Sequence, residues 1–286
     1  MNEPKKIVIT GASGFVAKNI RKFLSLNNYK LISIARNNFK KYKNEEKIIL
    51  EKYDDPSLLN EIKNADVLIH LVGTGKQSVD SDFESINVGL TKHFVNLSKK
   101  TKIKKFIYFS GLGVSPTTPL GYFISKYKAE ILIQNSGLNY TIFRPSYIIG
   151  KDDLFTKYLK KQIQNGSIEI PGSGKFLIQP IHINDVEQIV LESILGKKFD
   201  NQIFDLVGPE KISFKDYVRL FSKNSDVLVK KINLEDAFHR AIHTSSSEFG
   251  VDDLNLLLGG FTGNHEKLKE ISGITFQSIL GLLKAC

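Results

Sequence analysis

The stretch KKIVITGASGFVAKNI, residues 5–20, predicts a buried strand that runs through a glycine turn into a helix. Residues 7–9 form a continuous apolar run of the kind buried in parallel sheets. The turn carries Gly11, Gly14 and Ala17, at the spacing where a sharp bend, a close backbone approach to a ligand and a close helix–strand contact require small residues. Because amide groups at a helix N-terminus attract anions, this segment predicts a site for the diphosphate of a dinucleotide.

The composition is that of a globular protein. With 286 residues, 41% of them hydrophobic, the chain can bury a full core. No apolar run approaches the roughly 20 residues that cross a bilayer, and the first residues lead into the first strand without a signal peptide. We therefore expect no membrane span and a cytoplasmic location. The single cysteine, Cys286, excludes an internal disulfide or a thiolate metal cluster.

The formal net charge of +10 raises the question of a nucleic-acid partner. Lysines are scattered over nearly every segment, and only residues 36–43 and 99–105 resemble basic patches. The second patch precedes an apolar strand, where a solvated connection explains it. We expect a small-molecule substrate and no nucleic-acid partner.

The first half of the chain alternates strands and helices. An apolar stripe at helical spacing runs from Phe83 to Leu97, and a second helix is expected over 121–136. Alternation of this kind predicts an α/β fold with a doubly wound, parallel sheet of the Rossmann type. After the first strand, further strands are predicted at 31–35, 47–50, 66–72, 105–110 and 140–146.

The pattern changes after about residue 150. We expect residues 1–150 to form the dinucleotide-binding domain, with 174–206 returning to it. Residues 151–173 and 207–286 are predicted to form a smaller α+β lobe that binds the substrate. The helices that flank the sheet could also form a homodimer.

A candidate catalytic pair lies in the second predicted helix. Tyr122 and Lys126 are four residues apart, so their side chains project from one helix face. A nearby ammonium favours the phenolate of a tyrosine, which makes the phenol an acid or base near neutral pH. Ser110, at the end of the preceding strand, is a candidate donor to the reacting oxygen.

The residue at the end of the second predicted strand indicates whether the chain prefers NAD or NADP. Enzymes that use NAD usually carry an acid there, which accepts from the ribose 2′-hydroxyl. This chain has Arg36 at that place, and a guanidinium binds a 2′-phosphate through parallel hydrogen bonds. The sequence therefore favours NADP over NAD.

Six motifs follow one another along the chain: TGASGFVA at 10–17, HLVG at 70–73, INVG at 86–89, YFISK at 122–126, RPSYIIG at 144–150 and PIHINDV at 180–186. In their order and spacing the chain resembles the short-chain dehydrogenases/reductases of the extended or atypical kind, which include NAD-dependent epimerases and dehydratases. The resemblance implies that Tyr122 and Lys126 are the catalytic pair, and the Lys126 ammonium could also hold a ribose hydroxyl of the cofactor. The cofactor-binding residues that it implies are Gly11, Ser13, Gly14, Phe15, Val16, Asp54, Leu71, Val72, Gly73, Pro145 and Ser146, with Arg144 beside the last two.

Two departures from that pattern concern the active-site hydroxyl. Ser110 and Tyr122 are only 12 residues apart, and Leu112 stands where epimerases of the extended group carry the hydroxyl. Ser115 is an alternative to Ser110. The shortened loop is closer to atypical relatives of the 39 kDa subunit of respiratory complex I, some of which bind a cofactor without turning over a known substrate.

Two functions follow from these residues. The first is an NAD(P)-dependent oxidoreductase or epimerase/dehydratase that moves hydride between the cofactor and a carbonyl or secondary alcohol, such as that of a sugar nucleotide. The alternative is a non-catalytic NADP(H)-binding protein that serves assembly or redox sensing. No metal site is expected, because His70 and His182 lie too far apart in the sequence. Asp185 is expected to cap a helix that begins near Val186.

Overall fold

The computed structural model describes residues 5–75, 82–243 and 250–285, so Cys286 lies outside it. The chain divides into two compact units. The first contains residues 1–144 and 186–204, and the second contains residues 145–185 and 205–286. None of the described helices combines the length and the apolar character that crossing a membrane requires.

The first unit is built on a seven-stranded sheet with the order β11-β6-β5-β4-β1-β2-β3. Neighbouring strands from β3 to β6 pair in parallel. The order reverses at β1, which lies between β2 and β4, and this is the place where parallel sheets of this type bind ligands. The strands are β1 (Lys6–Thr10), β2 (Lys30–Ala35), β3 (Glu45–Ile49), β4 (Val67–His70), β5 (Lys105–Phe109), β6 (Asn139–Pro145) and β11 (Gln202–Leu206).

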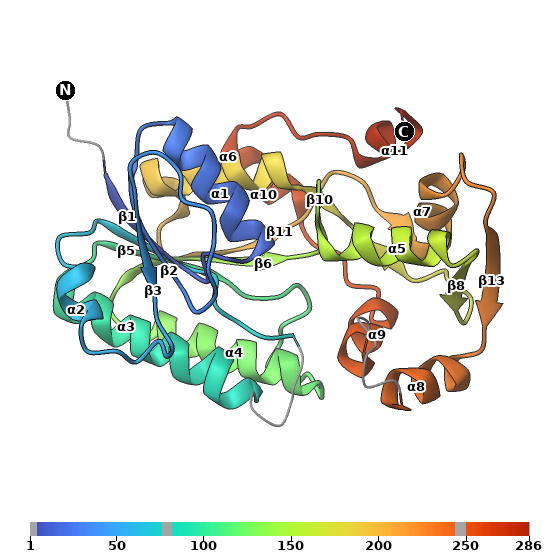
Figure 1. Cartoon of the computed structure of the whole chain (residues 1–286), viewed down its shortest axis with the longest axis horizontal. Helices are drawn as coiled ribbons and strands as arrows, with labels where there is room; N and C mark the ends of the chain where they lie inside the picture. The colour runs from blue at the N-terminus through green and yellow to red at the C-terminus, as the bar shows by residue number, and fades with distance from the viewer. Residues whose placement is uncertain (1–4, 76–81, 244–249, 286) are drawn as a thin grey trace. The chain divides into compact units, whose positions relative to one another are not determined.

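Helices cover both faces of this sheet, as a buried parallel sheet requires. Figure 1 shows α1 and α6 on one face and α3 and α4 on the other. The helical segments are α1 (Phe15–Leu26), α2 (Leu58–Glu61), a π-helical stretch η1 (Glu84–Gly89), α3 (Leu90–Thr101), α4 (Gly121–Gln134), α6 (Ile183–Leu195) and a 3-10 turn η2 (Lys197–Phe199). The Rossmann-type fold predicted from the sequence is confirmed.

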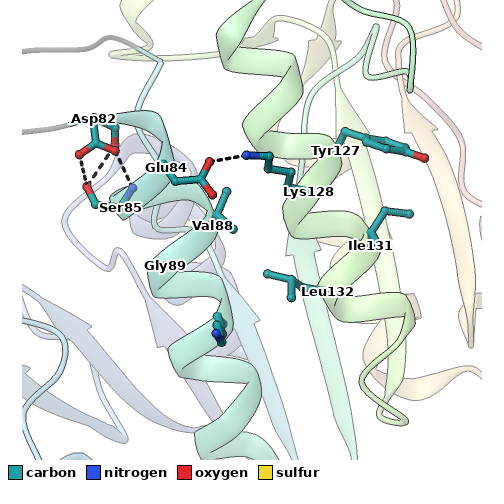
Figure 2. Close-up of a pocket in the computed structure, with 10 residues that line it drawn as sticks. Asp82, Glu84, Ser85, Val88, Gly89, Tyr127, Lys128, Ile131 and Leu132 are labelled. Carbon is teal, nitrogen blue, oxygen red and sulfur yellow. Dashed lines mark hydrogen bonds and ion pairs between the residues drawn. The ribbon is translucent and has the colours of Figure 1, made fainter.

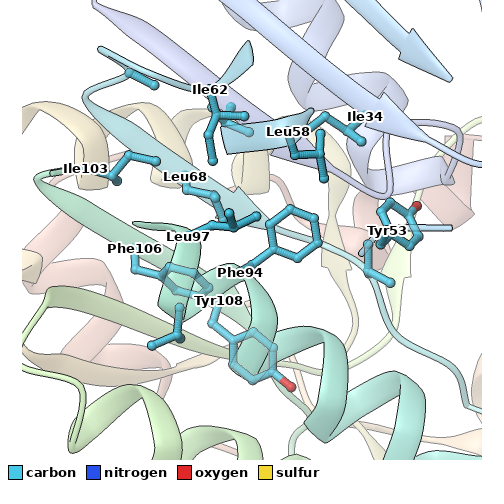
Figure 3. Close-up of a cluster of buried hydrophobic side chains, with 14 of the residues drawn as sticks. Ile34, Tyr53, Leu58, Ile62, Leu68, Phe94, Leu97, Ile103, Phe106 and Tyr108 are labelled. Carbon is cyan, nitrogen blue, oxygen red and sulfur yellow. The ribbon is translucent and has the colours of Figure 1, made fainter. Parts of the chain in front are cut away.

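The core between the sheet and α3 is apolar and aromatic (Figure 3). Phe94 is fully buried and contacts Tyr53 edge-on, with ring centroids 5.9 Å apart. His70, also fully buried, shares a hydrogen bond of 2.8 Å with the Thr10 hydroxyl. Burial lowers the pKa of His70 to about 3, so this side chain is a neutral member of the core.

The second unit mixes short strands and helices. Ile168, Ile170 and Phe214 are among the buried side chains of its core. Parallel pairs join β8 with β13 and β7 with β10, and β9 pairs with β12 in antiparallel fashion. Its elements are β7 (Ile148–Ile149), α5 (Leu154–Gln164), β8 (Ser167–Pro171), β9 (Leu177–Ile178), β10 (Ile181–His182), β12 (Ile212–Ser213), α7 (Phe214–Phe221), β13 (Leu228–Ile232), α8 (Leu234–His243), α9 (Val251–Leu258), α10 (His265–Ser272) and α11 (Ile279–Ala285).

Two details differ from the expectations above. Residues 145–150, 174–185 and 205–206 belong to the second unit, and Ile149 and Ile178 pack in its core. The helix expected near Val186 begins at Ile183, so Asp185 lies within its first turn and does not cap it. The Asp185 carboxylate instead accepts the backbone N–H of Gln277, at 3.1 Å.

Candidate dinucleotide site

A pocket of about 250 Å³ opens at the carboxyl ends of β1, β2 and β4. It combines small, apolar and polar residues, and none of its lining residues in the described part of the chain is acidic. Arg36 is the cation among them. The lining consists of Gly11, Ser13, Gly14, Arg36, Asn37, Tyr53, Leu71, Val72, Gly73, Thr74 and Ile86. Seven of these residues are predicted from the sequence to bind the cofactor: Gly11, Ser13, Gly14, Arg36, Leu71, Val72 and Gly73.

Gly11 shapes the floor of this pocket. Its φ of +72° lies in the left-handed region, which side chains other than glycine rarely adopt. A Cβ at this position would also lie 2.9 Å from the backbone of Leu71, closer than real contacts allow. The turn can therefore lie directly against the chain that leaves β4 only because residue 11 has no side chain.

The start of α1 leaves its first-turn amides to a ligand. Gly14 is the N-cap residue, no side chain caps this end, and no acid lies in the first turn. The Gly14 N–H donates to the Gly11 carbonyl within the turn, at 3.0 Å. Phe15 and Val16 open the helix, and Ala17 is buried against the sheet as its small side chain predicts. An anion at this end would meet the amides of Ser13, Phe15 and Val16.

Arg36 and Tyr53 form the wall of the pocket beyond β2. Arg36 follows the last residue of β2 and is exposed, so its guanidinium is accessible to a ligand. The backbone amides of Gly11 and Arg36 face the phenol of Tyr53, which is buried. Burial raises the pKa of Tyr53, and the Arg36 charge only partly offsets this effect. Asp54, the acid implied by the resemblance, is exposed and outside the pocket lining, while its neighbour Tyr53 lies within it.

Lys126 lies outside the pocket lining but next to Gly73, which lines the pocket. Its side chain is 5% exposed, and its ammonium donates to the Phe109 carbonyl at 3.0 Å. A Cβ on Gly73 would lie 3.0 Å from the Lys126 Nζ, so the absence of a side chain at residue 73 makes room for the ammonium. Burial lowers the pKa of Lys126 to about 8, although the nearby Glu130 carboxylate opposes the shift.

Asn87 joins the chain after β4 to α4 through hydrogen bonds. It is fully buried and accepts the Thr74 N–H at 2.9 Å. Its amide donates to the Thr74 carbonyl at 3.1 Å and to the Ser125 hydroxyl at 2.9 Å. Asn87 belongs to the motif INVG, but it is not among the predicted site residues. An asparagine among the apolar positions of a helix was the available signal, since a buried amide needs partners.

Tyr122 lies next to Lys126 on α4, as its spacing predicts. The phenol oxygen lies 3.2 Å from the position that a Cβ on Gly111 would occupy, and the ring packs edge-on against Phe83 with centroids 5.9 Å apart. The Lys126 Nζ lies 6.0 Å from the centre of the Tyr122 ring. The phenol therefore rests against the turn that follows β5, within the field of a buried ammonium.

The two candidate serines have other surroundings. Ser110 is 3% exposed, its N–H donates to the Phe143 carbonyl at 2.7 Å, and its hydroxyl has no hydrogen-bond partner among the described residues. The Ser115 hydroxyl shares a bond of 3.0 Å with Thr117 in its own turn. Leu112 is buried, and its apolar side chain supplies no hydroxyl at the position where the epimerase pattern has one.

The remaining predicted positions lie at the end of β6. Arg144 forms a double ion pair with the buried Glu130, at 2.9 and 2.6 Å, so its guanidinium is engaged within the first unit. Pro145 and Ser146 belong to the second unit, and their role at the cofactor stays a prediction. No group of three His, Cys, Asp or Glu side chains suited to a metal ion occurs in the described ranges.

A second hollow lies on the first unit between η1, the start of α3 and α4 (Figure 2). Its volume is about 830 Å³. The Glu84 carboxylate reaches from η1 to the Lys128 ammonium on α4, at 2.9 Å, and Ile131 and Leu132 line the apolar part. This hollow contains neither Gly11 nor Gly14 of the turn after β1, and its lining glycine, Gly89, lies within η1, so we assign the nucleotide chemistry to the first pocket.

The first pocket fits a nicotinamide dinucleotide in its donor set. Its floor is a turn that a Cβ would fill, and uncapped amides at α1 suit a diphosphate. Arg36 suits a phosphorylated or hydroxylated ribose at one end, and Lys126 suits a ribose hydroxyl at the other.

Known proteins resemble this chain over more than half of its length. A relative from Dictyostelium discoideum, subunit 9 of the 1 alpha subcomplex of mitochondrial NADH dehydrogenase, is 25% identical over 165 residues, which cover 58% of this chain and 46% of the relative. The chain thus spans less than half the length of this relative and of the 40 kDa NADH-ubiquinone oxidoreductase subunit of Neurospora crassa, of which 44% is covered. A photosystem II assembly factor of Cyanophora paradoxa is 25% identical over 247 residues, covering 85% of this chain and 76% of that protein.

Solved structures show the same fold over nearly the whole chain. A nucleoside-diphosphate-sugar epimerase from Staphylococcus aureus matches with a TM-score of 0.79 at 17% identity, covering 98% of this chain and 99% of the other. The UDP-glucuronic acid 4-epimerase of Bacillus cereus, in complex with UDP-glucuronic acid and NAD, matches with a TM-score of 0.75 at 16% identity, covering 98% and 96%. The model of the NAD dependent epimerase/dehydratase family matches residues 7–201, and the chain therefore belongs to that family.

Proposed function

We propose that the first unit binds NADP(H) and that Tyr122 and Lys126 use it to interconvert a carbonyl and a secondary alcohol. One observation carries this proposal: the Lys126 ammonium and the glycine-lined pocket meet at Gly73, where a Cβ would lie 3.0 Å from Nζ. The machinery for holding a dinucleotide and the machinery for moving a proton are therefore contiguous within one unit.

The cofactor is proposed to lie with its diphosphate at the amides of Ser13, Phe15 and Val16. Arg36 would pair with a ribose 2′-phosphate, which favours NADP over NAD. Lys126 would hold a hydroxyl of the other ribose. When bound, the nicotinamide supplies a hydride acceptor or donor, and every proton must come from the protein or from water.

Tyr122 is proposed to be the acid or base of the reaction. Its phenol gives a proton to a carbonyl oxygen in the reducing direction and takes one from a hydroxyl in the oxidising direction. The Lys126 ammonium stabilises the phenolate that remains. The substrate class that we favour is a sugar nucleotide, because the structural neighbours include epimerases of UDP-sugars, but the second unit sets this choice.

A second candidate function is supported by the surroundings of the missing hydroxyl. Leu112 is buried at the expected position, and the Ser110 hydroxyl is buried as well. Without that group, the chain would be a non-catalytic NADP(H)-binding protein that serves assembly or redox sensing. The named roles of two relatives, a respiratory-complex subunit and an assembly factor, agree with this alternative. The homodimer and the cytoplasmic location expected from the sequence stay predictions.

Replacement of Arg36 tests the cofactor preference. In Arg36→Glu, the loss of a charge-assisted contact and the added repulsion of a 2′-phosphate should raise the Kd for NADPH roughly 30- to 100-fold, which corresponds to about 2–3 kcal/mol. The Kd for NADH should change by less than about threefold, and Lys63→Glu, an equal charge reversal outside the pocket, should affect neither. Isothermal titration calorimetry measures the Kd of both cofactors for the wild type and for the two variants. An equal loss for both cofactors would contradict the preference.

Replacement of Tyr122 separates the two candidate functions. Tyr122→Phe should lower turnover about 10²- to 10⁴-fold, because the phenolic proton is lost, and leave the Kd for NADPH nearly unchanged. Tyr127→Phe, the same change on the same helix, is the matched control. Turnover is followed by cofactor absorbance with a panel of sugar nucleotides and secondary alcohols. A wild-type protein that binds NADPH but turns over no member of the panel supports the second candidate.

Burial of the Lys126 ammonium predicts a pH dependence of stability. Because the pKa in the folded chain is about 8 and an unfolded lysine has a higher pKa, the unfolded chain binds more protons between these values. The free energy of unfolding should therefore rise with pH, by about 2 kcal/mol between pH 7.5 and 9.5 relative to Lys126→Met. Urea unfolding of both proteins at several pH values measures this. Parallel curves would show that the ammonium is not buried.

A further inference from the structure

A buried arginine lies behind the glycine turn. Arg21, on α1, is 1% exposed, and its guanidinium pairs with the carboxylate of Glu45, whose side chain is fully buried. Arginine on a helix is ordinarily solvated, so the burial of Arg21 is unusual. Neither Arg21 nor Glu45 lines the pocket.

The Arg21 guanidinium joins three segments of the chain. One of its NH groups donates to the Ala12 carbonyl in the glycine turn, at 2.7 Å. The other donates to the Lys40 carbonyl at 2.6 Å and to the Glu45 carboxylate at 3.0 Å. The ring of Phe39 covers the guanidinium, with its centroid 4.2 Å from Cζ. The guanidinium thus donates to acceptors in the turn after β1, in the connection between β2 and β3, and at the start of β3.

The bond to Ala12 determines the direction of the next amide. In a trans peptide the carbonyl and the following N–H point to opposite sides. The Ala12–Ser13 peptide is trans, as are all the others in the described part of the chain. Because Arg21 holds the Ala12 carbonyl inward, the Ser13 N–H points away from the interior, and Ser13 itself is exposed and lines the pocket.

The same cluster fixes the connection that carries Arg36. Lys40 is held through its carbonyl, and the Tyr42 N–H donates to Glu45 at 2.6 Å. Burial acts against ionisation of Glu45, but hydrogen bonds from Arg21 and Tyr42 hold its pKa below the ordinary value. The chain from Arg36 to Glu45 is therefore tied to the back of the phosphate-binding turn by one ion pair.

Stability alone does not account for this arrangement. Burying two charges costs several kcal/mol per ion before their attraction is counted, and apolar residues of similar size often serve a core as well. A fork that bonds two separate backbone carbonyls instead fixes orientations. Both carbonyls belong to segments that line the proposed cofactor site or lead from it.

We propose that Arg21, held by Glu45, is a positioning residue for dinucleotide binding: it turns the Ser13 amide toward the diphosphate and fixes the Arg36 connection at the ribose. This inference rests on the proposed function, because it needs a dinucleotide in the pocket. Arg21 touches no ligand in this scheme and acts only through the backbone of Ala12 and Lys40.

The test uses Arg21→Met and Arg21→Lys in the full chain, with Lys105→Met as the matched control. Lys105 forms an ion pair of 2.5 Å with Asp200 in the same unit and lies outside the pocket lining, so its loss should lower the melting temperature without reaching the site. The Kd for NADPH is measured well below each melting temperature. We expect an increase of at least tenfold for Arg21→Met, a smaller increase for Arg21→Lys, and less than twofold for Lys105→Met.

Amide hydrogen exchange in the ligand-free chain adds a readout without cofactor. Relative to the wild type, the Tyr42 amide should exchange at least tenfold faster in Arg21→Met, and its exchange rate should be unchanged in Lys105→Met. A wild-type protein that binds NADPH together with Arg21 variants of unchanged Kd would overturn the positioning role and leave the proposed function standing. An Arg21→Lys variant that equals the wild type would show that charge alone suffices and would also overturn it. A wild-type protein that binds no dinucleotide would instead refute the proposed function.

Discussion

The site depends on the close approach of two backbone segments, the turn after β1 and the chain that leaves β4. A Cβ at Gly11 would lie 2.9 Å from the Leu71 backbone, and the φ of +72° also requires glycine. Because of this contact, the turn lies directly against the chain that leaves β4, and the uncapped amides of α1 lie at the carboxyl edge of the sheet. The pocket, its basic end at Arg36 and its junction with Lys126 at Gly73 all follow from that placement.

Much of this could be predicted from the sequence, because it depends on local patterns. The apolar run before Gly11, the four-residue spacing of Tyr122 and Lys126, and the strands that follow one another at regular intervals are all readable along the chain. The long-range partners of side chains were not readable. Nothing in the sequence pattern marks Arg21 as buried. Asp54 is predicted at the cofactor in place of its neighbour Tyr53, because only the fold decides which of two adjacent residues faces the pocket. Asp185 was misplaced for a related reason: its partner is Gln277, 92 positions along the chain.

Among the described residues, fewer polar groups surround Tyr122 than the proposed proton transfer would use. Lys126 has a buried ammonium, a backbone acceptor and a position beside the pocket, and Asn87 and Ser125 order the helix around it. Leu112 is buried at the position where the resemblance places an assisting hydroxyl, and the buried Ser110 hydroxyl has no hydrogen-bond partner among the described residues. Family membership covers both outcomes, since the family fold positions a dinucleotide whether or not a reaction follows. The second unit has a core of its own, and its role in substrate binding stays a prediction.

The central claim is that the amides at the start of α1 hold the diphosphate of a nicotinamide dinucleotide. A titration of the isotopically labelled chain with NADPH, followed by backbone amide chemical shifts, tests this most directly. The account predicts that Ser13, Phe15 and Val16 show the largest saturable shifts, together with Arg36 and Gly73 at the two ends of the pocket. Absence of saturable shifts at these amides, or shifts concentrated instead around Ile131 and Leu132 in the other hollow, would contradict it.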